Sequence, residues 1–269
     1  MLVSVPHAGR DYPAGFALLS RLPIDRIRSL EDRYADLLVE KAVERGHRAI
    51  VCAVPRVWID LNRGEREFDP GLIAAGARHA PLPSAKVRGG LGVVPRRVIG
   101  GGDIWRGSLS TAEFETRLAD IHRPWHASIA STLGAMSGRF GGAILIDLHS
   151  MPPLAAQPGV ALRPQVVIGD LFGRSASGRI AQAALGFVQD QGIAATLNAP
   201  YAGGHTLERH GRPDRNIHAL QVEIDRSLYL DLLLDRPGTG LPRMQAFVAG
   251  LATFLAAEIC ASPLAEAAE

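Results

Sequence analysis

Two histidines, His7 and His149, stand just past apolar runs that are typical of buried strands. His149 follows four apolar residues and Asp147 in "GGAILIDLHSMPP", and His7 follows "MLVSVP". An ionisable group at the end of a buried strand needs a hydrogen-bond partner, a metal ion or a substrate. Ligands gather at the carboxyl ends of strands in open α/β sheets, and imidazole nitrogen is a preferred zinc ligand. The pair therefore indicates a shared metal site, although each histidine taken alone is equally compatible with a hydrogen bond to a neighbouring loop.

A catalytic zinc site uses about three protein ligands and keeps one position open for water. We expect the third ligand to be a carboxylate or a histidine, and Asp32 is the first candidate. Glu31 and Asp36 compete for this role. Ser29 and Asp32 also have the spacing of a helix-capping pair, so spacing alone leaves the identity of the third ligand open.

His122 and His126 have the H-x3-H spacing that places two imidazoles on one face of a helix, where they can bind a metal ion. No glutamate follows the first histidine as it does in H-E-x-x-H, and both histidines flank an apolar stripe. We therefore favour a structural role for His122 and leave the role of His126 open.

Glu223 lies inside the predicted strand "LQVEID", between Val222 and Ile224. Because side chains alternate along a strand, Glu223 is expected on the face opposite these two residues. It is either a solvent-facing side chain or a general base. Asp147, two residues before His149, is a candidate for orienting a metal-bound histidine by a hydrogen bond.

Two polar loops offer donors for a substrate carboxylate. In "WIDLNRGERE", Asn62 and Arg63 have the composition of a forked clamp for a carboxylate, although a surface loop with a salt bridge fits the same residues. In "GGHTLERHGRP", paired glycines permit close backbone approach while His205, Arg209 and Arg212 offer further donors.

Short apolar runs alternate with longer amphipathic ones, which predicts an α/β fold in a single domain of residues 1–269. A long irregular segment, residues 64–109, is typical of functional loops rather than of padding. Ser110 opens a helix with a capping box, and Pro124 should bend it. The strands are expected at residues 1–5, 48–54, 143–148, 165–170 and 217–225, and the other helices at 29–45, 175–191 and 243–260. The segment 193–197 is expected to lead into a polar loop.

Composition and charge exclude several functional classes. The chain has 269 residues, 47% of them hydrophobic and 21% charged, and its net charge of +2 gives no support for a nucleic-acid or membrane-surface role. Its two cysteines do not form a C-x-x-C pair, which indicates a reducing compartment and disfavours a thiolate zinc site. We see no secretion signal and no apolar run of about 20 residues, and expect a cytoplasmic protein. A G-x-S-x-G elbow, a P-loop and a dinucleotide fingerprint are all absent.

The motifs taken in order resemble one known family. The segments "SVPHAGRDYP", "EDRYADLL", "IDLNR", "IDLHS", "AGGHTLERHGRP" and "HALQVEIDRSLYLD" are similar to those of the N-formylglutamate amidohydrolase (N-formylglutamate deformylase) family, from about residue 3 to 231. That family is related to zinc carboxypeptidases and aspartoacylase. The resemblance implies a zinc-exopeptidase-like (phosphorylase/hydrolase-like) fold, in which a mixed, mostly parallel sheet of about eight strands lies between helices in a three-layer α/β/α arrangement.

The resemblance also implies a role for individual residues. His7, Asp32 and His149 would bind Zn²⁺ or another divalent metal, and Glu223 would activate water. Arg63, with Asn62, would hold a substrate carboxylate and act in catalysis, assisted by His205 or Arg209. One departure stands out: zinc carboxypeptidases carry H-x-x-E, whereas Arg10 occupies the acid's position here, so the carboxylate ligand must come from farther along the chain.

The expected activity is therefore zinc-dependent hydrolysis of N-formyl-L-glutamate to formate and L-glutamate. One alternative is a zinc hydrolase of the same fold that acts on another N-acyl amino acid or a small peptide. A second alternative is a non-catalytic binding protein that has kept the pocket. The expected partner is a small-molecule substrate, and the sequence is compatible with a homo-oligomer without indicating its size.

Overall fold

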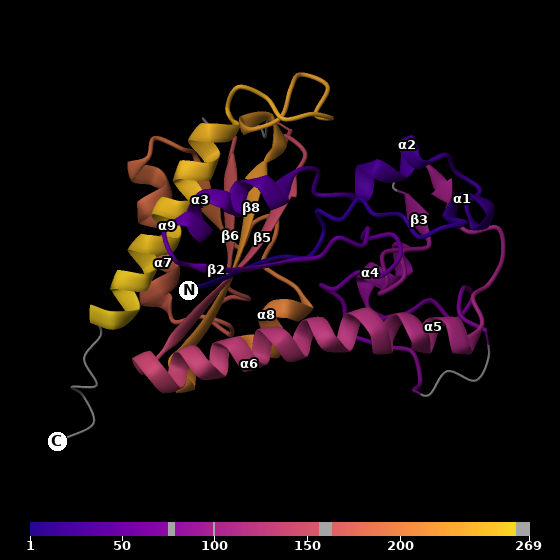
Figure 1. Ribbon diagram of the computed structural model, residues 1–269, viewed down its shortest axis with the longest axis horizontal. Coiled ribbons are helices and arrows are strands. Elements are labelled where there is room, and N and C mark those ends of the chain that lie inside the picture. Colours follow the sequence, from indigo (N-terminus) through magenta and orange to yellow (C-terminus); the bar gives the residue numbers. More distant parts are fainter. Residues whose placement is uncertain (75–78, 99, 156–162, 262–269) are drawn as a thin grey trace. The chain divides into compact units, whose positions relative to one another are not determined.

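The computed structural model describes residues 1–74, 79–98, 100–155 and 163–261 (Figure 1). The chain divides into two compact units. The sheet unit comprises Met1–Val5, Tyr34–Ile50 and Ile129–Glu269, and the loop unit comprises Pro6–Arg33 and Val51–Ser128. The single-domain organisation stays a prediction.

The sheet unit is built on six strands in the order β2-β1-β5-β8-β6-β7. The pairs β1–β5, β5–β8 and β6–β7 are parallel, whereas β6 and β8 are antiparallel. The predicted α/β fold with a mixed, mostly parallel sheet is therefore confirmed. Over the described residues the sheet has six strands, fewer than the eight or so that the resemblance implied. The strand bounds are Leu2–Val5 (β1), Arg48–Val51 (β2), Ala143–Met151 (β5), Val166–Gly169 (β6), Ala195–Leu197 (β7) and Ile217–Asp225 (β8).

The register of the three central strands sorts their side chains onto two faces. Ser4 of β1 is paired with Asp147 of β5, which is paired with Gln221 of β8, and two residues farther on His149 is paired with Glu223. Because side chains alternate, these five residues share one face, and we call them the polar row. Between these pairs the other face carries the apolar residues Val3, Ile146, Leu148, Leu220 and Val222, and the next pair along is Ser150 with Ile224.

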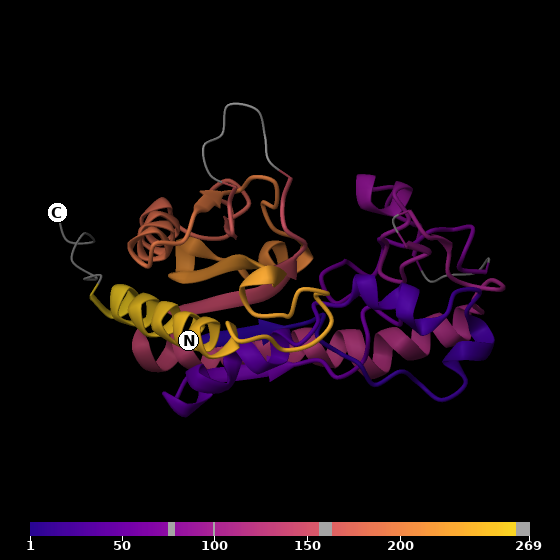
Figure 2. The same ribbon diagram turned by 90° about the horizontal axis from the view of Figure 1, so that it is seen from above.

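Helices cover the sheet. On one side α9 (Leu241–Ala261) lies between α3 (Glu40–Glu44) and α7 (Gly178–Asp190) and runs beside the sheet in both views (Figures 1 and 2). The aromatic side chains Phe187, Phe247 and Phe254 join α7 to α9. A short helix, α8 (His205–His210), packs against β5 and β8. A 3-10 turn, η2 (Ala35–Val39), leads into α3, and two further 3-10 turns, η4 (Pro213–Arg215) and η5 (Arg226–Leu228), flank β8.

Among the described residues, α9 is the one helix long and apolar enough to cross a membrane by length and composition. The sequence predicts a helix at 243–260 but does not mark it as a possible membrane span, because it holds no apolar run of about 20 residues. Its most apolar stretch has a mean hydropathy of 1.6, and half of that stretch is buried inside the protein. Met244, Val248 and Leu255 are buried, as expected for a helix that packs on a sheet and on two other helices. We therefore interpret α9 as a core helix.

The loop unit consists of short elements joined by irregular chain. These are α1 (Phe16–Leu19), α2 (Ile24–Ile27), η1 (Arg28–Leu30), α4 (Ala85–Arg88), the hairpin of β3 (Arg97–Val98) and β4 (Gly102–Asp103), and α5 (Thr111–Arg117). The Arg117 guanidinium stacks on the half-buried Trp58 ring, 3.4 Å from its centre, and the buried Trp105 and Phe16 complete this cluster.

The helix start predicted at Ser110 is confirmed, because the Ser110 and Glu113 side chains form the capping box. Near Pro124, where a bend is expected, the structure has one π-helical turn, η3 (Leu118–His122), between α5 and α6 (Arg123–Phe140). Proline has no N–H to donate within the helix, so the hydrogen-bonding pattern changes in the preceding turn.

Four element predictions differ from the structure. The strand expected at 48–54 ends at Val51. The helix expected at 29–45 is interrupted, because Tyr34 adopts a left-handed φ of 58° and the Asp32 amide donates to the His7 carbonyl instead of to a helical partner. The strand expected at 143–148 continues to Met151 and includes His149. The loop expected before β8 contains α8, whose buried Thr206 and Leu207 face the sheet.

Candidate functional site

His149 is held by a buried carboxylate of its own strand. Its Nε2 lies 2.9 Å from Asp147 Oδ2, and Ser4 Oγ donates to Asp147 Oδ1 at 2.6 Å. Asp147 is fully buried and His149 is 3% exposed. An ionised carboxylate only accepts hydrogen bonds, so the ring nitrogen that faces it carries the proton and Nδ1 carries the lone pair. The hydrogen bond expected from Asp147 is therefore present, and it places the lone pair of the His149 ring on Nδ1.

Glu223 lies on the same face of the sheet as His149, in the adjacent strand and at the same register position. As predicted, its side chain is on the face opposite Val222 and Ile224. Gln221, two residues earlier, donates from Nε2 to Glu223 Oε1 at 2.9 Å. The sheet unit thus places the carboxylate of Glu223 and the imidazole of His149 side by side on one face.

His7, just after β1, has a matching arrangement in the loop unit. Its Nε2 lies 2.7 Å from Asp60 Oδ1, and Asp60 also accepts from Arg56 Nε and the Asn62 amide, each at 2.9 Å. Burial alone would raise the pKa of Asp60, but Arg56, His7 and Arg63 outweigh it and hold this pKa well below its ordinary value. The ionised Asp60 therefore keeps the proton on Nε2 of His7 and the lone pair on Nδ1.

Asp32 is the acid that lies against this lone pair. Its Oδ2 is 3.5 Å from His7 Nδ1, and both atoms are acceptors. Two ligands of a tetrahedral ion with metal–ligand bonds of about 2.0–2.1 Å lie about 3.3 Å apart, so the separation fits two ligands of one divalent ion. Glu31 is engaged elsewhere, since it accepts from Tyr12 Oη and Arg33 Nη1. His7 and Asp32 therefore form a candidate metal-binding pair.

Arg63 is fixed before any substrate binds. It is 6% exposed, its Nε donates to the Leu91 carbonyl at 2.9 Å and its Nη1 to the Asn62 carbonyl at 2.6 Å. These contacts set the plane of the guanidinium, which is the geometry that a carboxylate clamp needs. Asn62 is buried beside it and donates its backbone amide to Asp60.

His122 and His126 support this segment from the helix. Nε2 of His122 donates to the Arg63 carbonyl at 2.8 Å, and Nε2 of His126 donates to the Leu61 carbonyl at 3.0 Å. Each ring uses one nitrogen to hold a backbone carbonyl of the 61–63 segment. The contacts give both histidines a structural role, the one that the sequence favoured for His122.

His205 and Arg209 lie one turn apart on α8, in the sheet unit. His205 is half-buried, whereas Arg209 is exposed and makes no hydrogen bond or ion pair within the described part of the chain. The next residue, His210, has its pKa lowered to about 4, first by burial and then by Arg209. A carboxylate near α8 would meet an available cation.

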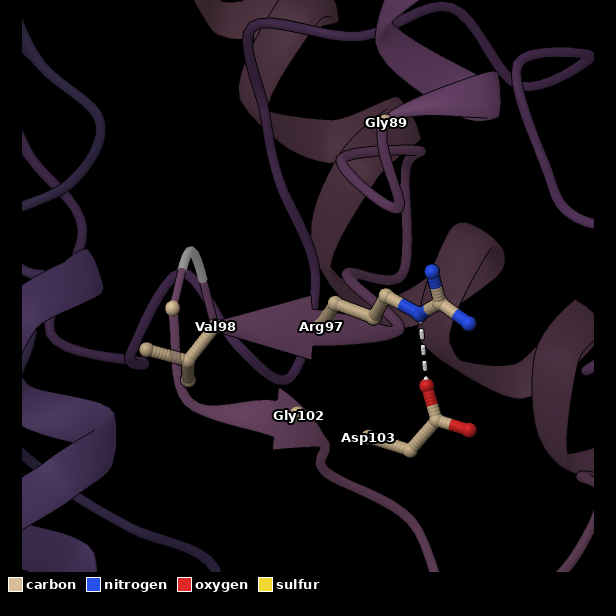
Figure 3. Close-up of a pocket in the computed structure, with 6 residues that line it drawn as sticks. Gly89, Arg97, Val98, Gly102 and Asp103 are labelled. Carbon is tan, nitrogen blue, oxygen red and sulfur yellow. Dashed lines mark hydrogen bonds and ion pairs between the residues drawn. The ribbon is translucent and has the colours of Figure 1, made fainter.

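The hairpin of β3 and β4 borders a hollow of about 470 Å³ (Figure 3). Arg97 Nε donates to Asp103 Oδ1 at 2.7 Å across the hairpin, so the two charges at the hollow satisfy each other. None of the residues singled out by the sequence lines it. We assign no part of the site to this hollow.

Two polar residues near the site were not identified from the sequence as partners. The sequence places Asp60 in the loop "WIDLNRGERE" and does not predict that it is the partner of His7, which lies 53 positions away. Gln221 was not singled out, although its spacing of two residues from Glu223 on a strand is the one signal that places both on one face.

Comparisons with known proteins agree on one family. The family model described as N-formylglutamate amidohydrolase matches residues 1–230. The chain is 29% identical to the N-formylglutamate deformylase of Pseudomonas aeruginosa over 238 residues, and 27% identical to that of Pseudomonas putida over 236. Each alignment covers 86% of this chain and 82% of the relative.

Solved structures support the same relation. The N-formylglutamate amidohydrolase of Ralstonia eutropha JMP134 is similar with a TM-score of 0.87 and 28% identity, over 96% of this chain and 93% of that one. A gene product of Agrobacterium tumefaciens, with a TM-score of 0.70, 18% identity and coverage of 96% and 90%, shares the fold.

Proposed function

The chain belongs to the N-formylglutamate amidohydrolase family, and from this premise we propose that it hydrolyses N-formyl-L-glutamate to formate and L-glutamate with one bound divalent metal ion, zinc in the first place. We assign His7, Asp32 and His149 as the metal ligands, Glu223 as the group that moves the proton, and Arg63 with Asn62 as the clamp for a substrate carboxylate. The activity in the names of the relatives supports the reaction.

The observation that carries the metal assignment is the hydrogen bond that fixes the tautomer of each of the two histidines. Each donates from Nε2 to a fully buried aspartate, Asp60 for His7 and Asp147 for His149, which leaves Nδ1 as the basic nitrogen. Metal-binding histidines are oriented by carboxylates in this way. The 3.5 Å separation of His7 Nδ1 and Asp32 Oδ2 supports the third ligand. A divalent ion supplies Lewis acidity, which lowers the pKa of water and polarises an amide carbonyl.

Glu223 then does the proton chemistry. Its carboxylate takes a proton from the attacking water as the oxygen bonds to the formyl carbon, and it delivers that proton to the amide nitrogen as the C–N bond breaks. The products are formate and the free amine of glutamate. Because Gln221 donates to Oε1 of Glu223, the proton is carried by Oε2.

The two carboxylates of the substrate need separate cations. Arg63, fixed by the Leu91 and Asn62 carbonyls, binds one carboxylate and stabilises the negative charge that develops on the carbonyl oxygen. Arg209 and His205 of α8 bind the other, supported by the availability of the Arg209 guanidinium. Holding both ends of the substrate places the formyl group against water and Glu223.

Two further expectations accompany this function. Cys52 and Cys260 are both free thiols, which supports a reducing, cytoplasmic location. The oligomeric state stays a prediction.

The test is formate release from N-formyl-L-glutamate by protein stripped of metal and then reloaded with Zn²⁺. We expect activity to be lost with the metal and restored by it, and Glu223→Gln to lower kcat by about 10²–10⁴-fold at unchanged metal content. Glu258→Gln is the matched control, since Glu258 pairs with Arg179 on the surface. Full turnover by stripped protein would refute the metal assignment. Turnover of N-acetylglutamate or N-formylaspartate in place of N-formylglutamate would refute the substrate and favour another N-acyl amino acid.

A further inference from the structure

The mechanism leaves one buried polar side chain of the polar row unexplained. Gln221 is 5% exposed and its amide lies 2.9 Å from Oε1 of Glu223, which is 9% exposed. A carboxylate accepts hydrogen bonds only, so the amide nitrogen of Gln221 faces it and the amide oxygen points away. The contact is a charge-assisted hydrogen bond between residues i and i+2 of a central strand, shielded from water.

Gln221 is itself held from both sides. Its register partner in β5 is Asp147, and its partner in β6 is Gly169. A Cβ at Gly169 would lie 2.7 Å from the backbone carbonyl of Ala202, so the chain before α8 crosses the sheet directly above that glycine. Gln221 is thus enclosed by two paired strands and a crossing segment, and it presents its donor from a fixed position.

We propose that Gln221 is a positioning residue for Glu223. The inference rests on the proposed function of Glu223 as the group that moves the proton. The terminal torsion of a glutamate is broad and roughly two-fold, so a hydrogen bond to one carboxylate oxygen narrows the orientations that the carboxylate samples. The Gln221 amide occupies Oε1, fixes this torsion and assigns the proton to Oε2. Gln221 therefore acts on turnover through its hydrogen bond to Glu223.

The decisive substitution is Gln221→Met, which keeps the length of the side chain and removes the donor. We expect kcat for formate release to fall about 10-fold, because a smaller fraction of the carboxylates faces the water. KM should stay within about twofold, and the metal content should not change, because the residue holds neither substrate nor metal. Gln221→Asn keeps the amide but is one methylene too short to reach Oε1, so we expect the same loss, and it replaces the first variant if that one does not fold.

Gln245→Met is the matched control. Gln245 is another buried glutamine of the sheet unit whose amide donates to a glutamate, Glu40 Oε2, at 2.7 Å. We expect this variant to lower the thermal midpoint without lowering kcat.

A double-mutant cycle separates positioning from general stability. In the Glu223→Gln background, Gln221→Met should change the residual kcat by less than about twofold, because the group it positions is gone. An equal loss in both backgrounds would overturn the inference, and so would a folded, metal-loaded Gln221→Met enzyme with kcat within twofold of the original. Full activity of Glu223→Gln alone would instead refute the proposed function, so the two failures are distinguishable.

Discussion

Asp60→Asn is the substitution for which the structure gives the most detailed expectation. The Asp60 carboxylate is fully buried and accepts from His7 Nε2, Arg56 Nε and the Asn62 amide. Asparagine keeps the shape but is neutral and has one acceptor oxygen instead of two. Either Arg56 or His7 then faces an amide N–H, and the preference of His7 for the tautomer with its lone pair on Nδ1 is weakened.

The size of the effect follows from these contacts. Loss of a carboxylate that orients a metal-bound histidine typically weakens metal affinity by about 10–100-fold. Leaving a buried charge without its partner costs about 3–5 kcal/mol. The Arg56 side chain is 19% exposed, so water can partly solvate its charge once the carboxylate is gone. We therefore expect a loss of about 3 kcal/mol in the free energy of unfolding, at the lower end of that range.

Two assays separate the effects. Competition with a chromophoric chelator measures Zn²⁺ affinity, and urea denaturation of metal-free protein measures stability. Asp69→Asn is the control, because Asp69 pairs with Arg96 in the same unit at a more exposed position and should cost less than about 1 kcal/mol without changing metal affinity. A folded Asp60→Asn protein that binds Zn²⁺ within threefold of the original affinity would refute this account of His7.

Three further outcomes are expected. Arg63→Lys keeps the charge but loses the fixed planar fork, so kcat/KM for N-formyl-L-glutamate should fall about 100-fold, and an unchanged value would remove Arg63 from the substrate site. Gly9→Ala would place a Cβ 2.1 Å from the Val54 carbonyl oxygen, so it should lower the free energy of unfolding by about 3 kcal/mol or more in a urea titration. Gly107→Ala has open space around it and should change that free energy by less than about 0.5 kcal/mol. Burial, with Arg209 as the next cause, lowers the pKa of His210 from 6.5 to about 4, so between these pH values the folded protein binds fewer protons than the unfolded chain. The contribution of His210 to the free energy of unfolding should therefore be complete above about pH 6.5 and fall by up to about 3 kcal/mol toward pH 4. His210→Gln should remove that part of the pH dependence.

The sequence predicted the central strands well because their signals are local. Residues 217–225 are bounded by turn residues and are apolar or alternating throughout, and β8 begins and ends where expected. The helix predicted at 29–45 was wrong between Glu31 and Tyr34, because the Asp32 amide bonds to the His7 carbonyl, 25 positions earlier in the chain. Such a contact overrides helical periodicity and leaves no trace in the local pattern. The six residues of α8 were missed for a similar reason, since packing against β5 and β8 stabilises a helix too short to form by propensity.

Some residues of the candidate site could likewise be predicted from the sequence and others could not. Positions after buried strands made His7 and His149 candidates, and alternation within a strand made Glu223 one, because both patterns are readable from the chain. The sequence left Glu31, Asp32 and Asp36 open as candidate ligands, because it does not show that Tyr12 and Arg33 engage Glu31. The tautomer of His7 could not be predicted from the sequence, because its partner Asp60 is distant in the chain. The partner of His149, Asp147, is two residues away and was anticipated.

Anomalous diffraction at the zinc edge from crystals of the metal-loaded protein tests the central claim most directly. The account predicts one ion bound by Nδ1 of His7, Nδ1 of His149 and the carboxylate of Asp32, each at about 2.0–2.2 Å, with Glu223 beside the remaining position. An ion bound through Nε2 of either histidine, an ion held by His122 and His126 instead, or no ion at saturating zinc would contradict it.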